Sequence, residues 1–64
     1  MKLQDVLDVV TTSHVTVWQS DAQGKFVVVA KGSSRRKEPF EGHIEKEVVK
    51  ISCTDWGKIA ITVK

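Results

Sequence analysis

The side chains best suited to act as a base, a nucleophile or a metal ligand are His14, His43 and Cys53. The residues around them form no Ser-x-Gly elbow, no paired-carboxylate signature and no phosphate-cradling glycine loop. Cys53 alternates with Val49 and Ile51, which predicts a small buried core residue rather than a reactive thiol. The spacing of the three is also unlike that of a zinc site. The sequence therefore predicts a protein that is not an enzyme and needs no metal or cofactor.

The densest charge feature is the basic triplet Arg35-Arg36-Lys37. It lies in a segment rich in glycine and serine, which predicts a loop over residues 33–42. Such a loop can contact the phosphates of a nucleic acid and position it without reading its sequence. The alternative, which so short a run slightly favours, is a solvated loop whose charges are partly cancelled by neighbouring glutamates. The sequence leaves both alternatives open.

Tryptophan supplies a second group of candidate contact residues. Trp56 lies in the turn Asp55-Trp56-Gly57, where a large aromatic side chain has no local structural need. It either folds back over the sheet or contacts a partner, and exposed tryptophan is enriched at binding hot spots. Trp56 and Lys58 therefore join the basic triplet as candidate residues for binding a protein target or a nucleic acid.

Trp18 belongs to a different group, because alternation places it on one strand face with Val27 and Val29. One helix cannot cover both faces of a sheet, so this apolar face predicts an interface, most simply a homodimer joined sheet to sheet. The alternative is a base-stacking platform for a single-stranded nucleic acid, with lysines along its backbone. The presence of only one aromatic residue on that face argues against the platform.

The elements that must position these groups are predicted from apolar periodicity. The leucines and valines at positions 3, 6, 7 and 10 have the spacing of one helix face, which predicts a helix over residues 3–10. The rest of the chain alternates apolar and polar residues in runs separated by Asp…Gly turns, which are typical of hairpins. The predicted strands cover residues 14–20, 25–31, 48–54 and 58–64, with turns at 21–24 and 55–57.

The predicted fold is a single small α+β domain over residues 1–64, in the order α-β-β-loop-β-β. The N-terminal helix packs on one face of a four-stranded, mostly antiparallel sheet. The expected core comprises Phe26, Val28, Ile51, Ile59 and Ile61 against Leu3, Val6, Leu7 and Val10. The other face is expected to carry Trp18, Val27, Val29, Ala60 and Thr62, ringed by Lys25, Lys50 and Lys58.

Composition agrees with one small domain. The 64 residues carry 10 basic and 8 acidic side chains, a net charge of +2 that is too small to require a polyanionic partner. Cys53 is the single cysteine, so no intramolecular disulfide can form, which fits a reducing cytosol. Asp5 and Asp8 interrupt the N-terminal apolar residues, which predicts neither a signal peptide nor a membrane span. We therefore expect a cytoplasmic protein.

The order of these segments resembles that of short proteins carried by prophages and mobile elements of Gram-positive bacteria. The segments that carry the resemblance are a leucine-rich helix (3–10), Val15-Thr16-Val17, the turn from Asp21 to Gly24, Glu47-Val48-Val49-Lys50-Ile51 and the hairpin from Asp55 to Val63. The loop from Ser33 to Gly42 departs from the acidic, leucine-rich connection of those proteins. The resemblance implies an accessory factor, and some small proteins of this origin are anti-CRISPR inhibitors.

Two functions are consistent with the sequence. The first is a non-enzymatic mobile-element protein that binds and inhibits a host defence complex such as a CRISPR nuclease, using Trp56 and the basic triplet. The second is a nucleic-acid-binding module that uses the basic loop and the sheet lysines, with salt-dependent affinity. Balanced charge and the lack of an aromatic series slightly favour the first. An enzyme would need a site built across a dimer, because one protomer supplies too few groups.

Overall fold

The computed structural model of the chain describes residues 1–12, 14–55 and 57–64, without the side chains of Thr54 and Asp55. Its elements are α1 (Leu3–Val9), β1 (His14–Ser20), β2 (Phe26–Gly32), the 3-10 helix η1 (Glu38–His43), β3 (Val48–Asp55) and β4 (Lys58–Val63). The predicted order is confirmed, and every predicted strand agrees with an observed one to within one residue at either end. The predicted loop contains η1.

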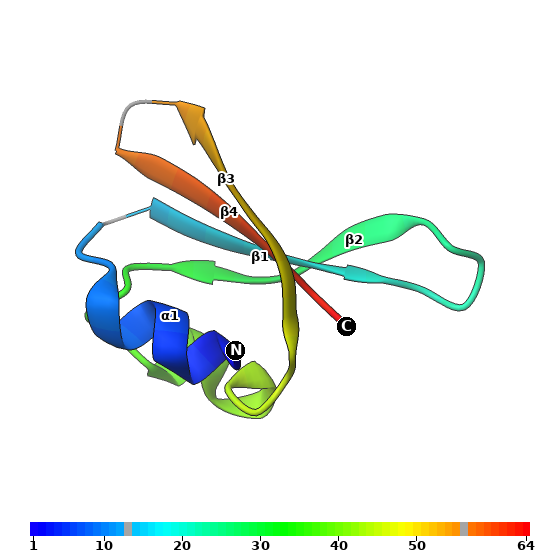
Figure 1. Cartoon of the computed structure of the whole chain (residues 1–64), viewed down its shortest axis with the longest axis horizontal. Coiled ribbons are helices and arrows are strands. Elements are labelled where there is room, and N and C mark those ends of the chain that lie inside the picture. Colours follow the sequence, from blue (N-terminus) through cyan, green and yellow to red (C-terminus); the bar gives the residue numbers. More distant parts are fainter. Residues whose placement is uncertain (13, 56) are drawn as a thin grey trace.

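The sheet has four strands in the order β2-β1-β4-β3. β1 and β2 form an antiparallel hairpin, as do β3 and β4, whereas the central strands β1 and β4 run parallel. Parallel neighbours cannot be joined by a tight turn, and here the chain between them passes through β2, η1 and β3 (Figure 1). The α+β class is confirmed, with a sheet that is mixed.

The two hairpin turns depend on glycines with positive φ. In the first, Oδ1 of Asp21 accepts hydrogen bonds from the N–H groups of Gln23 at 2.8 Å and Lys25 at 2.9 Å. Gly24 has a φ of +82° and Gly57, after β3, has a φ of +71°. Glycine adopts this left-handed conformation without steric cost. The sequence therefore specifies both turns locally.

The helix α1 covers one face of the sheet and depends on it for stability. Leu3, Val6 and Leu7 are buried, as their spacing predicts. The carboxylate of Asp5 accepts a hydrogen bond from the N–H of Lys2 at 3.0 Å and places negative charge at the helix N-terminus. A helix of 7 residues is not stable alone, so its packing against the strands maintains it.

The core is completed by Phe40, which is the largest fully buried side chain and has an exposed fraction of 0%. Pro39 lies at the start of η1, where its fixed φ suits a helix. A Cβ added at Gly32 would lie 3.1 Å from Cγ of Pro39, so glycine lets η1 approach the end of β2. The core cluster consists of Leu3, Val6, Leu7, Val15, Val17, Ala30, Phe40, Ile61 and Val63.

A β-bulge in β2 overturns part of the predicted core. Val17 pairs with Ala30 but Trp18 pairs with Val28, so the register shifts by one residue at Val29. The extra residue reverses the faces of the strand beyond it. Phe26 and Val28, predicted to be buried, are therefore 59% and 46% exposed.

Two predictions for β3 are also wrong. Ile51 pairs with the buried Ile61 and so faces the helical side, but it is 44% exposed because it lies on an edge strand outside the core cluster. Cys53, predicted as a buried core residue, is exposed. The short helix α1 does not extend over this part of the sheet (Figure 1).

Candidate functional site

No helix of the described residues lies over the sheet face opposite α1 and η1 (Figure 1). A groove of about 430 Å³ crosses this face. It is lined by Trp18, Phe26, Val49, Lys50, Ser52, Ala60 and Thr62. We call this face the open face.

Charge is distributed unequally between the two sides of the molecule. Lys31 pairs with Thr16, Lys50 lines the groove and Lys58 alternates with Ile59, which places all three lysines on the open face. The only acidic residue in the four strands is Asp55, at the end of β3. Six of the eight acidic residues lie in α1, in η1 or between η1 and β3: Asp5, Asp8, Glu38, Glu41, Glu45 and Glu47. The open face therefore favours an anionic ligand.

Trp18 lies on the open face, as expected, but with different neighbours. Val28, its partner across the hairpin, and Phe26 share its side of the sheet because of the bulge. Val27 instead pairs with Gln19, and Val29 packs against the core cluster. The three residues proposed for a dimer interface are therefore not on one face.

The three residues of the basic triplet have different surroundings. Lys37 forms an ion pair with Asp8 on α1 at 3.0 Å, and both side chains are exposed, so the pair contributes little stability. Arg36 is exposed and donates its backbone N–H to the carbonyl of Ser33. Arg35 lines a polar pocket with Ser33 and with the segment before β1. Trp56 lies outside the described residues. Lys58 is the first residue of β4 and lies at one end of the open face.

The imidazole of His43 is partly buried. Its Nδ1 is buried and has no hydrogen-bond partner among the described residues. Burial lowers the pKa of His43 below its ordinary value, and the positive charge of Lys46 lowers it further. The folded chain therefore resists protonation of this imidazole more than the unfolded chain does.

We expect the wild-type protein to lose stability as the pH decreases below 6.5, the ordinary pKa of histidine. Below that pH, His43 of the unfolded chain binds a proton that the folded chain binds less readily. The contribution is fully present above that pH. Thermal melts at about pH 7.5 and about pH 5 should show a larger decrease in Tm for the wild type than for His43→Gln. The exposed His14 provides the matched control, His14→Gln. Equal pH dependence in the wild type and His43→Gln would contradict this assignment.

The remaining candidates for chemistry stay apart. Within residues 1–12, 14–55 and 57–64, no three His, Cys, Asp or Glu side chains are grouped so that they could hold a metal ion. In the same part of the chain, no helix is long and apolar enough to cross a membrane. No protein-family model, curated protein or solved structure matches the chain. The open face and the polar pocket at Arg35 are therefore the candidate functional surfaces.

Sequence reasoning missed two parts of these surfaces. Phe26 and Val49 line the groove because the strand register shifts near each of them, at Val29 in β2 and at Val49 in β3. An extra residue within an apolar run does not change the alternation of apolar and polar residues, so the sequence gives no sign of it. Thr11 and Ser33 meet in the polar pocket although they are distant in sequence. The hydroxyl residues around the basic triplet were the only local hint of that pocket.

Proposed function

We propose that this protein is a non-enzymatic binding protein whose open face binds single-stranded nucleic acid. The observation that carries the proposal is the pairing of two aromatic side chains, Trp18 and Phe26, in one groove that is flanked by lysines and free of acidic strand residues. The bulge in β2 supplies the second aromatic group, whose absence argued against a base-stacking platform.

The physical basis is stacking combined with attraction of the phosphate backbone. Bases stack on aromatic side chains regardless of sequence, and each stacked base contributes about 1–3 kcal/mol. Lys31, Lys50 and Lys58 would lie along the backbone of the bound strand and release its counterions. The helical side carries charges of both signs, with Glu45 and Asp8 paired to Lys2 and Lys37, so the open face is the preferred face for the strand.

We expect Trp18→Ala to weaken binding of a labelled single-stranded oligonucleotide by about 1–3 kcal/mol, because it removes one stacking surface. Phe26→Ala should have an effect of the same kind, and Lys50→Ala should reduce the slope of log K against log salt by roughly 0.7. Fluorescence polarisation at low and moderate salt measures all three effects. Duplexes of the same sequence should bind more weakly, since their bases cannot stack on the groove.

Lys2→Ala is a matched control, because Lys2 forms an ion pair with Glu45 on the helical side. It removes the same charge as Lys50→Ala but should leave the affinity for the oligonucleotide nearly unchanged. Absence of binding to any single strand at low salt would contradict the proposal. If Trp18→Ala and Lys2→Ala weakened oligonucleotide binding equally, the open face would not be the binding site.

A protein target is the second candidate, and the apolar part of the groove favours it, since interface cores are enriched in aromatic side chains. On this proposal the chain is a mobile-element protein that inhibits a host defence complex such as a CRISPR nuclease in the bacterial cytoplasm. Trp18 and Phe26 would then be its contact residues. Retained inhibition of such a complex by a protein that binds no nucleic acid would favour this candidate.

The homodimer stays a prediction from the sequence. Two copies joined through their open faces would bury the groove, but they would also bring the lysines of both copies together. Like charges placed opposite one another oppose association. Light scattering at the salt concentrations of the binding experiment would give the mass of the binding species.

A further inference from the structure

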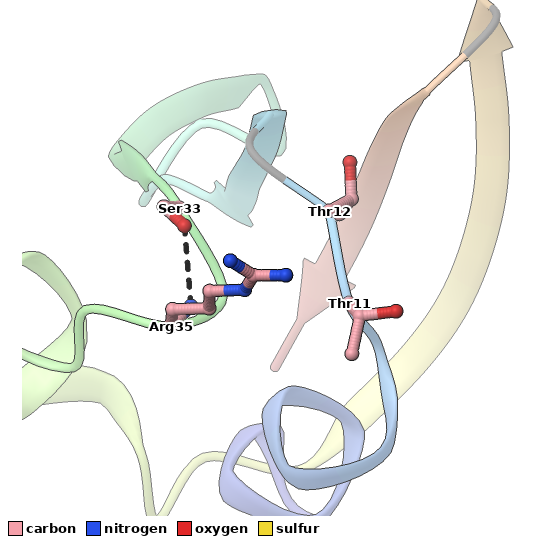
Figure 2. A pocket seen from close by; sticks show the side chains of 4 residues that line it. All are labelled: Thr11, Thr12, Ser33 and Arg35. Atoms are coloured by element: carbon pink, nitrogen blue, oxygen red, sulfur yellow. Dashed lines mark hydrogen bonds between the residues drawn. The ribbon is translucent and has the colours of Figure 1, made fainter.

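A polar pocket of about 250 Å³ lies between the segment that follows α1 and the loop that follows β2. Thr11, Thr12, Ser33 and Arg35 line it, and Figure 2 shows the Arg35 side chain extending from its loop toward the Thr11–Thr12 segment. The volume exceeds that of several water molecules, each of which occupies about 30 Å³ in the liquid. A hydrated tetrahedral anion therefore fits.

Both walls of the pocket are held in place. The backbone N–H of Arg35 donates to Oγ of Ser33 at 3.2 Å, which fixes the turn that carries the arginine (Figure 2). Ser34, the residue between them, is hydrogen-bonded through its side chain to both the N–H and the carbonyl of Thr12. The hydroxyl of Thr12 donates to the carbonyl of Gly57. These contacts fix the backbone of Arg35 relative to the opposite wall, while its side chain is exposed.

The pocket presents a cation and hydroxyl groups but no carboxylate. Among the described residues, neither the guanidinium of Arg35 nor the hydroxyl of Thr11 takes part in a hydrogen bond or an ion pair. Lys37, two residues along the loop, is by contrast paired with Asp8. A guanidinium that has no partner among the described residues and lies in a hollow next to the Ser33 hydroxyl suits a phosphate, because it can donate two parallel hydrogen bonds to it.

We propose that this pocket binds a phosphate group, held by the guanidinium of Arg35 with the hydroxyl of Ser33 as an additional donor and Thr11 and Thr12 as the opposite wall. Lys31 and Gly32, which precede Ser33, line a neighbouring hollow with His14 and Thr16. Because Lys31 and Thr16 belong to the open face, the pocket lies at one end of that face. The identification of the phosphate as one from a bound nucleic acid rests on the proposed function, whereas phosphate binding itself does not.

The first test uses inorganic phosphate and amide chemical shifts of the wild-type protein, with chloride at the same ionic strength as the reference. We expect shifts that saturate and that are confined to Thr11, Thr12, Ser33 and Arg35. Arg35→Ala should weaken binding by about tenfold or more. Arg36→Ala, which removes the same charge from the adjacent residue outside the pocket, should change it by less than about threefold. Absence of saturable shifts, or equal loss in both variants, would overturn the proposal.

A second arm distinguishes the source of the phosphate. If the phosphate belongs to a nucleic acid, Arg35→Ala should weaken oligonucleotide binding more than Arg36→Ala does. If phosphate binds but the two variants bind oligonucleotides alike, the pocket accepts a free phosphorylated compound and the nucleic-acid source is wrong. If no oligonucleotide binds while phosphate does, the proposed function fails and the pocket stands. Arg35→Lys, which keeps the charge without the planar fork, should bind phosphate with intermediate affinity.

Discussion

Phe40→Ala is expected to leave most of the protein unfolded at room temperature. The ring of Phe40 has an exposed fraction of 0% and is the largest buried side chain among the described residues, although it comes from the 3-10 helix η1 and not from the sheet. Truncation of a buried phenylalanine costs about 3–5 kcal/mol, from lost burial and from the cavity that remains. A core of this size supplies roughly 3–5 kcal/mol in total. The substitution therefore removes about as much stability as the domain has.

Urea titrations followed by circular dichroism would measure the change. Phe26→Ala is the matched control, because it deletes the same ring from a position that is 59% exposed, and it should alter the free energy of unfolding by less than about 0.5 kcal/mol. Phe40→Leu refills most of the volume and should remain folded with a lower urea midpoint. Equal stability of Phe40→Ala and Phe26→Ala would mean that η1 does not close the core.

The strand boundaries could be predicted because alternation and turn chemistry are local. Asp21 and Gly24 specify one hairpin turn within four residues of the chain, and the structure shows the corresponding hydrogen bonds and positive φ. The spacing of Leu3, Val6 and Leu7 likewise fixes the buried stripe of α1 without knowledge of its partner. These features depend only on residues close in sequence.

The faces of β2 and the parallel pairing could not be predicted in the same way. In the run Val27-Val28-Val29 both faces are apolar, so an inserted residue changes no pattern, yet it moves Phe26 to the open face. The parallel contact of β1 and β4 joins residues more than forty positions apart, such as Val17 and Ile61. Such pairings depend on how the whole chain folds over its core. The groove is a product of both features, and it is therefore visible only in the structure.

The polar pocket depends on a long-range contact between Ser34 and Thr12. Removal of this contact is the second change for which we expect a large effect on stability. Ser34 is buried, and its Oγ accepts a hydrogen bond from the N–H of Thr12 at 3.0 Å and donates one to the carbonyl of Thr12 at 3.1 Å. Ser34→Ala leaves the partly buried N–H of Thr12 without its partner. A buried donor without an acceptor costs about 1–3 kcal/mol. We expect a loss of stability in this range.

Ser34→Ala should also weaken phosphate binding, because the contact between Ser34 and Thr12 sets the distance between the two walls of the pocket. Urea titrations and phosphate titrations on the same sample measure the two effects together. Ser20→Ala, an exposed serine at the end of β1 that lines neither the groove nor the pocket, is the matched control and should change neither. The Ser34→Ala variant could instead lose stability and still bind phosphate as tightly as the wild type. That result would show that Arg35 holds the anion without the opposite wall. The pocket would then be reduced to a single arginine on a loop.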